Sequence, residues 1–327
     1  MCVVNPLGGA LRHYTDALVE VVTAAGASVV RYEITEPSSS GSSRYRWLRQ
    51  YIEMLRRART ERSVLTIVTW PVLGYFDLVL LRLFRNRAGD TVLVVHDPEP
   101  LVPSIGHGTV GRVVARRVGP EPHLLVHGDE ALSALDRHGL ADRASVLPHP
   151  VRRREHSDDA RPAPTRPIVR VLGSWKEDRD MEVLQALGAL MSERLDLEIH
   201  GRGWPSIPGW TVADRFLAEQ EFDELVRTAS VVLVPYRRVF QSGIAVRALE
   251  LGTPFIGPRV SAHEDLYPDL PDLLVDVDLD TTARVSAWVT AIRSAVALPD
   301  DVLRSTAAAA VDAAAAGWTA LVEESRA

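Results

Sequence analysis

Short apolar runs alternate along the chain with segments in which apolar residues recur every three or four positions. Apolar runs bounded by turn residues predict buried strands, and the longer period predicts amphipathic helices. We expect strands at residues 2–5, 28–33, 64–69, 91–95, 123–126, 144–148, 168–172, 197–199, 231–234 and 255–258. We expect helices at 11–25, 45–59, 76–84, 129–138, from 181 onward, and at 222–229, 243–251 and 281–296. This alternation predicts an α/β protein built on parallel sheets.

The stretch 231–258 is the clearest single unit, with a strand, a loop, a helix and a second strand in succession. Its loop ends in Gln241-Ser242-Gly243. A small hydroxyl residue at a helix N-cap followed by glycine leaves backbone N–H groups open to an anion such as phosphate. Most helix starts bind nothing, so a plain structural cap is the alternative.

Length and net charge limit the number of domains and the kinds of ligand. The 327 residues fit two α/β domains of about 150 residues each. We place the first at 1–151, a charged, proline-containing linker at 152–167, the second at 168–311 and a last helix at 312–327, after an alanine-rich segment that starts at Asp300. A net charge of −6 gives the whole chain no electrostatic reason to bind nucleic acid.

The cysteine count and the hydropathy of the chain exclude further classes of protein. A single cysteine, Cys2, excludes an internal disulfide and a cysteine-based metal site. No apolar run reaches about 18 residues, and no basic segment precedes an apolar stretch at the N-terminus. We therefore expect a cytoplasmic protein.

The helix expected at 45–59 is amphipathic and basic. Its apolar stripe includes Leu48, Tyr51, Ile52 and Leu55, while Arg46, Arg49, Arg56 and Arg57 gather on the opposite side. One interpretation is a core-facing helix with a solvated arginine face. The alternative is a peripheral contact with anionic lipid on the inner face of the membrane.

Polar and charged residues follow several expected strands, where parallel sheets place ligand-binding groups. His96-Asp97 follows the strand 91–95, and Asp97 is a candidate to orient a hydroxyl group or accept its proton. The alternative is a loop histidine and a turn-forming aspartate before proline. Lys176 and Arg179 lie three residues apart after the strand 168–172, and a solvated loop is their alternative. Gly8-Gly9 precedes the first helix, either as a ligand-facing loop or as a plain turn.

These segments, in this order, resemble GT-B fold glycosyltransferases of the large retaining family 4-like group, the glycosyl transferases group 1. The resemblance rests on Gly8-Gly9, the strand ending in His96-Asp97, the pair Lys176 and Arg179, Gly201 after the strand 197–199, and the stretch 231–258. It implies two Rossmann-like domains facing each other across a cleft, with the last helix crossing back to the first domain.

The resemblance also implies an activity. A hexosyltransferase-like enzyme would move a sugar, with retention, from a nucleotide-diphosphate sugar on the second domain to a glycan, lipid-linked or small-molecule acceptor on the first, in polysaccharide or glycoconjugate biosynthesis. His96 would contact the transferred sugar, and Lys176 and Arg179 would hold the diphosphate. Gly201, Gln241, Ser242 and Gly243 would line the donor site, with Gly8 and Gly9 on the acceptor side. No cofactor or metal is expected, since the cations replace one.

The chain departs from the family pattern at its paired acids. The two positions of the usual Glu-x7-Glu motif fall on Val239 and Arg247, and a guanidinium cannot accept a hydrogen bond from ribose. Glu250, one turn further, is the candidate replacement, and Arg247 is a candidate partner for a phosphate or a carboxylated sugar. Two alternatives stay open: a nucleotide-sugar 2-epimerase, and a catalytically silent GT-B subunit that activates a partner transferase.

Overall fold

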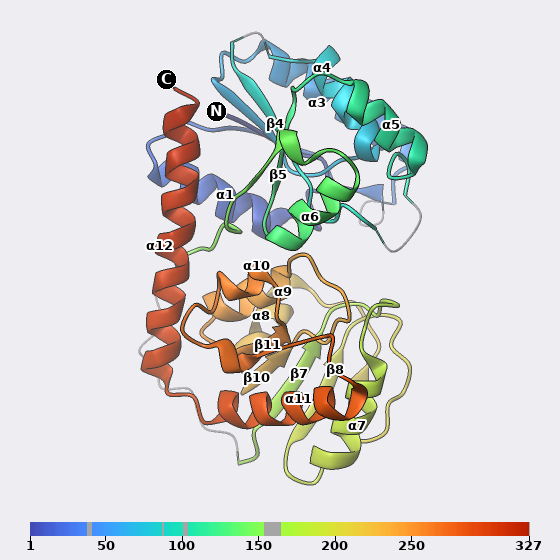
Figure 1. Cartoon of the computed structure of the whole chain (residues 1–327), viewed down its shortest axis with the longest axis vertical. Helices are drawn as coiled ribbons and strands as arrows, with labels where there is room; N and C mark the ends of the chain where they lie inside the picture. Colours follow the sequence, from blue (N-terminus) through green and yellow to red (C-terminus); the bar gives the residue numbers. More distant parts are fainter. Residues whose placement is uncertain (38–40, 87, 101–103, 154–164, 327) are drawn as a thin grey trace. The chain divides into compact units, whose positions relative to one another are not determined.

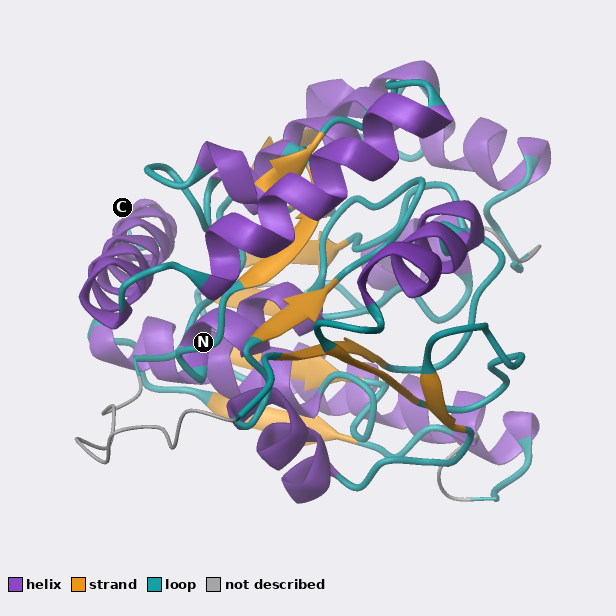
Figure 2. Ribbon diagram, turned by 90° about the horizontal axis from the view of Figure 1, so that it is seen from below, coloured by secondary structure: helices purple, strands orange, loops and turns teal. Residues whose placement is uncertain are grey.

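The computed structural model describes residues 1–37, 41–86, 88–100, 104–153 and 165–326. The chain divides into two compact units, Met1–Arg152 with Asp312–Ala327 (unit 1) and Arg153–Val311 (unit 2). Each unit holds a six-stranded parallel sheet covered by helices (Figure 1; Figure 2). The expected fold class, an α/β protein with two Rossmann-like domains, is confirmed. Most of the expected linker, residues 154–164, lies outside the described residues.

The sheet of unit 1 has the strand order β2-β1-β3-β4-β5-β6. Its strands are β1 (Cys2–Asn5), β2 (Val30–Glu33), β3 (Leu65–Val68), β4 (Asp90–Val94), β5 (His123–Val126) and β6 (Ala144–Val146). Its helices are α1 (Arg12–Ala24), α3 (Arg44–Thr60), α4 (Asp77–Leu83), α5 (Thr109–Arg117) and α6 (Asp129–Arg137), with 3-10 turns at Gly74–Phe76 and Ala141–Arg143. The sequence analysis did not predict α5. This helix has only nine residues, and its apolar positions Val110, Val113 and Val114 are β-branched residues that favour strands.

The last helix, α12 (Asp300–Glu324), is continuous through the alanine-rich segment. Its Trp318 and Val322 are fully buried in the core of unit 1, among residues of α1 and the sheet. The indole nitrogen of Trp318 donates a hydrogen bond to the carbonyl of Pro148 at 3.1 Å. Unit 1 is therefore completed by a segment that follows all of unit 2 in the sequence, as the resemblance implies for the last helix.

The sheet of unit 2 has the order β12-β11-β10-β7-β8-β9. Its strands are β7 (Ile168–Leu172), β8 (Asp196–His200), β9 (Thr211–Ala213), β10 (Val231–Leu233), β11 (Phe255–Pro258) and β12 (Leu274–Val275). Its helices are α7 (Met181–Met191), α8 (Glu219–Arg227), α9 (Gly243–Glu250), α10 (Ser261–Glu264) and α11 (Thr281–Val296), with a 3-10 turn at Pro271–Leu273. α7 packs on α11, and α8 packs on α9.

Both sheets contain a point at which the strand order reverses. In unit 1 this point lies at β1, which pairs with β2 on one side and β3 on the other. In unit 2 it lies at β7, which pairs with β10 and β8. Open parallel sheets bind ligands outside the carboxyl ends of strands at such a point. The topology thus directs attention to the loops after β1 and β3, and after β7 and β10.

The basic helix expected at 45–59 is α3, which buries Tyr51, Met54, Leu55 and Ala58 against unit 1. Its arginines 46, 49, 56 and 57 are exposed. Among the described residues, no helix is both long enough and apolar enough to cross a membrane. The arginine face of α3 is therefore solvent-accessible, as both interpretations of the helix require.

Candidate functional site

The loop after β7 places two cations beside one aromatic ring. The amide of Arg179 donates to the carbonyl of Lys176 at 3.1 Å, which closes a turn between them. Tyr236, which follows β10, pairs with Arg179 as an isolated antiparallel bridge. The Arg179 guanidinium lies 4.0 Å from the Tyr236 ring centroid, and the Lys176 ammonium lies 6.0 Å from it. The strand order brings these residues together at the reversal point of the sheet.

Arg179 is buried without a carboxylate partner among the described residues. Its side chain is 2% exposed, and Nη2 donates to the carbonyl of Leu172 at 3.1 Å. Its Nε and Nη1 atoms have no hydrogen-bond partner in the described part of the chain. Burial lowers the pKa of this guanidinium, but an arginine stays charged in proteins. A buried, charged group with two unsatisfied nitrogens is costly for the fold and suits an anionic ligand.

The first turn of α9 adds a second feature that suits anions. Ser242 is the N-cap, and its hydroxyl accepts from the amide of Ala245 at 3.3 Å. The amides of Gly243 and Ile244 precede the helical hydrogen bonds, so the helix itself gives them no acceptor. A Cβ atom placed on Gly243 would meet nothing within 4 Å. The fold itself therefore does not require a glycine at this position.

Gly173 lies where Arg179 and α9 approach each other. A Cβ atom on Gly173 would lie 3.3 Å from Ile244 Cδ1 and 3.6 Å from Arg179 Nη2. Gly201, a predicted donor-site residue, has a different explanation. Its φ is +153°, and a Cβ atom there would lie 2.0 Å from the Gly173 carbonyl oxygen. Gly201 thus lets the loops after β7 and β8 pass close to each other. This structural role explains the glycine without a bound donor.

The structure gives Arg247 partners other than a ligand. Its guanidinium, 7% exposed, forms ion pairs with Asp223 and Glu219 of α8. These contacts direct it toward α8, so Arg247→Glu would place a carboxylate among two others. Glu250 is buried at the end of α9, and Gln241 is half-buried before the cap. The site is therefore built from Lys176, Arg179 and the Ser242-Gly243 corner.

In unit 1, both glycines of the first loop have contacts within the protein. The amide of Gly8 donates to the carbonyl of Ile34 at 2.8 Å, and a Cβ atom there would lie 2.8 Å from Glu33. The amide of Gly9 donates to the Glu36 carboxylate at 2.9 Å. These contacts account for the pair as a close-packed turn between β1 and α1.

His96 is buried at the carboxyl end of β4. Its Nε2–H donates to the carbonyl of Thr69 at 3.0 Å, and the indole of Trp70 stacks on its ring with centroids 5.7 Å apart. Asp97 accepts from the amide of Glu99 at 3.0 Å, as in a turn before proline. The pair lies beside the loop after β3, one of the two loops at the reversal point of this sheet.

Three buried imidazoles, His96, His127 and His149, surround Tyr14 of α1. Tyr14 donates its hydroxyl to His127 Nε2 at 3.0 Å, and His127 Nδ1–H donates to the carbonyl of Leu147 at 2.9 Å. Burial lowers the pKa of His127 to about 4 and that of His149 well below its ordinary value. His127 and His149 are therefore neutral near pH 7.

The sequence analysis selected His96 but not Tyr236, Trp70 or the other two histidines of the cluster, His127 and His149. Aromatic residues in the loop after a strand, such as Tyr236 three residues after β10, were the available signal. The described residues contain no group of three or more His, Cys, Asp or Glu side chains that could hold a metal ion. What the arrangement in unit 2 can do is bind an anion, with a guanidinium and open helix amides as donors.

Comparison with known proteins identifies the fold as that of GT-B glycosyltransferases. The chain is similar to sucrose-phosphate synthase from Thermosynechococcus elongatus, with a TM-score of 0.65, 16% identity, and coverage of 99% of this chain and 96% of that one. It is also similar to Anabaena HepE in complex with UDP-glucose, with a TM-score of 0.64, 10% identity, and coverage of 99% and 98%. A third similar structure is trehalose 6-phosphate synthase from Burkholderia multivorans, with a TM-score of 0.59, 12% identity, and coverage of 100% and 98%.

At these identities the similarity shows the fold alone. No protein-family model matches the chain, and the search of curated protein sequences found no match.

Proposed function

We propose that the protein is a glycosyltransferase, which takes a nucleotide-diphosphate sugar on unit 2 and transfers the sugar to an acceptor on unit 1. The observation that carries the proposal is the buried guanidinium of Arg179, which lacks a carboxylate partner in the described residues. In a GT-B fold, at the reversal point of the second sheet, a diphosphate is the ligand that such a group suits. UDP-glucose, which the Anabaena HepE structure contains, is the first donor to test.

The proposed chemistry follows from the charge that develops on the donor. The bond between the sugar C1 atom and the diphosphate oxygen breaks, and its electron pair goes to the diphosphate. Arg179, Lys176 and the α9 amides stabilise that charge, which is the largest contribution protein groups make in such reactions. The acceptor hydroxyl forms the new bond to C1 on the same face, and its proton passes to the leaving diphosphate. Neither a protein base nor a metal is needed for this balance.

On the acceptor side, we assign His96 and Asp97 to contacts with hydroxyl groups. The Trp70 ring stacked on His96 supports a sugar-containing acceptor, because a sugar packs its C–H face on an aromatic ring and bonds through its hydroxyls.

The experiment is a binding screen followed by a turnover assay. Thermal shift with nucleotide diphosphates and their sugars should identify a donor, since a ligand at 100 times its Kd adds about 2.7 kcal/mol of stability. Release of nucleoside diphosphate should then require an acceptor. Isomerisation of the donor without an acceptor would indicate an epimerase instead, and binding without turnover would indicate a silent subunit. Failure of every donor to bind would overturn the proposal.

We also propose that α3 places unit 1 on an anionic membrane surface. Its exposed arginines 46, 49, 56 and 57 support this, because each cation near such a surface contributes about 1 kcal/mol. The protein should sediment with acidic vesicles at low salt and be released as salt screens the attraction. Replacing these four arginines by glutamine should abolish sedimentation. Equal binding to neutral vesicles would contradict the proposal.

A further inference from the structure

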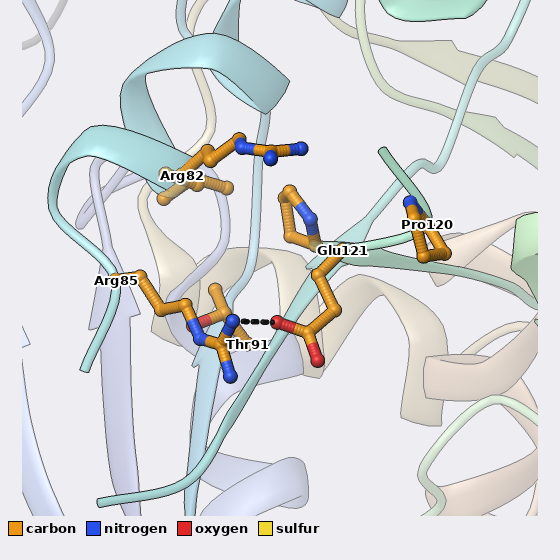
Figure 3. Close-up of a pocket in the computed structure, with 7 residues that line it drawn as sticks. Arg82, Arg85, Thr91, Pro120 and Glu121 are labelled. Carbon is orange, nitrogen blue, oxygen red and sulfur yellow. Dashed lines mark ion pairs between the residues drawn. The ribbon is translucent and has the colours of Figure 1, made fainter. Parts of the chain in front are cut away.

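Unit 1 has a cavity at the amino-terminal edge of its sheet, opposite the candidate acceptor loops. Its volume is about 220 Å³, and its lining consists of Leu81, Arg82, Arg85, Thr91, Pro120, Glu121 and Pro122 (Figure 3). Thr91 lies near the start of β4, whereas His96 follows the end of that strand. At about 3.3 Å per residue, roughly 17 Å separates them. The cavity is therefore distinct from the site proposed for sugar transfer.

Positive charge dominates this cavity. The side chain of Arg82 makes no hydrogen bond or ion pair with a described residue. Arg85 Nη1 and Glu121 Oε2 form an ion pair at 2.6 Å (Figure 3). Glu121 Oε2 nevertheless accepts no hydrogen bond with acceptable geometry from a described residue. Because Glu121 is the one carboxylate among the described residues of the lining, an anion with better geometry can compete with it for Arg85.

A third guanidinium, that of Arg143, holds the turn that carries the lining residues Pro120, Glu121 and Pro122. Arg143, 8% exposed, donates to the carbonyls of Gly119 and Pro122 at 2.7 Å and 2.8 Å. Its pKa is lowered first by burial and then by the nearby charge of Arg82. The turn that forms the wall is thus held rigidly, and it carries a fixed positive charge.

Gly119 lets Arg82 lie against this turn. A Cβ atom on Gly119 would lie 2.5 Å from Arg82 Nη1, and the backbone of Gly119 does not need positive φ. Alanine at this position would therefore displace the guanidinium without straining the backbone or removing charge.

We infer that this cavity binds a small phosphomonoester. Its phosphate would lie between Arg82 and Arg85, whose guanidinium groups match phosphate geometry. Its carbon body would cover Leu81 and Pro122, which form the buried apolar floor. A volume below the roughly 300–1,000 Å³ of pockets for drug-sized ligands suits a small molecule. The inference does not depend on the proposed transferase activity.

The experiment is calorimetric titration of the full chain with glycerol 3-phosphate and with inorganic phosphate, at constant ionic strength. Arg82→Gln should weaken glycerol 3-phosphate binding about tenfold or more, as loss of a charged hydrogen bond does. Gly119→Ala should weaken it while keeping every charge. Glu121→Gln should strengthen it, because Arg85 loses its competing partner. Arg59→Gln, on the exposed face of α3, is the matched control and should change nothing.

Two further controls test whether the variant folds and whether the ligand binds in this cavity. Arg82 is exposed at the rim, so Arg82→Gln should unfold at the wild-type temperature without ligand. Equal affinity in the wild type, Arg82→Gln and Glu121→Gln would overturn the inference. It would also be overturned if Arg179→Met abolished binding and Arg82→Gln did not, because the phosphate would then occupy unit 2. Tighter binding of inorganic phosphate than of glycerol 3-phosphate would exclude an organic ligand that uses the apolar floor.

Discussion

Replacing Arg179 by methionine should leave the stability of the fold nearly unchanged and greatly weaken ligand binding. The change removes two unsatisfied nitrogens from the interior, which relieves about 1–3 kcal/mol. It also removes the hydrogen bond to Leu172 and the stacking on Tyr236, which together stabilise the fold by a similar free energy. Methionine fills the space with a flexible apolar chain. We therefore expect the free energy of unfolding to change by no more than about 1 kcal/mol.

The same change should have a large effect on the ligand. Loss of a preorganised donor to a developing charge costs about 10²- to 10³-fold in kcat/KM. The affinity for a nucleoside diphosphate, measured by calorimetry, should fall with it.

Arg170 is the matched control, since it is also a buried arginine of unit 2 but is fully engaged. It is 6% exposed, with Nε 2.6 Å from Glu198 Oε2 and Nη1 2.6 Å from the carbonyl of Leu225. Arg170→Met would leave Glu198 without its guanidinium partner, which costs about 3 kcal/mol. Urea unfolding and donor titration of both variants make the comparison. If Arg179→Met destabilised the fold as Arg170→Met does, and left donor affinity unchanged, Arg179 would be structural.

Three further predictions each follow from the surroundings of one residue. Gly243→Val should abolish donor binding and leave the melting temperature unchanged, because a Cβ atom there meets no protein atom; unaltered calorimetric affinity would place the donor elsewhere. Ser242→Ala should cost about 1 kcal/mol of stability by loss of the cap, measured by urea unfolding. Burial lowers the pKa of His127 to about 4, so the folded state resists protonation and stability falls as pH drops below about 6.5. His127→Asn should reduce the loss between pH 7 and pH 5 by about 2 kcal/mol, and an equal loss in both proteins would contradict this.

The sequence predicts the regular elements well where burial is continuous. The strand 168–172 and the helix 281–296 have the expected bounds in the structure. The strand is apolar at every position except Arg170, and α11 follows a clear cap at Asp280. The three-residue β9 and the four-residue α10 have too few positions for any period to be visible.

The site is only partly predictable, because its key property is that the Arg179 guanidinium has no carboxylate partner among the described residues. Arg179 stands between Asp178 and Asp180 in the sequence, which suggests a paired arginine. In the structure Asp180 caps α7 and lies 2.8 Å from Arg284 instead. Tyr236 contacts Arg179 only because the strand order places β10 beside β7. Local patterns identify Arg179 as a candidate, but tertiary contacts decide that its charge stays available.

The discontinuity of unit 1 has a consequence for synthesis on the ribosome. Residues of unit 2 leave the exit tunnel after β6 but before Trp318, which fills the core against α1. Unit 2 is continuous in sequence, so it can fold as soon as it emerges. Unit 1 must wait with an open apolar face until α12 arrives, even though its strands are made first. We expect a nascent chain stalled before residue 312 to protect unit 2 from protease while unit 1 remains susceptible.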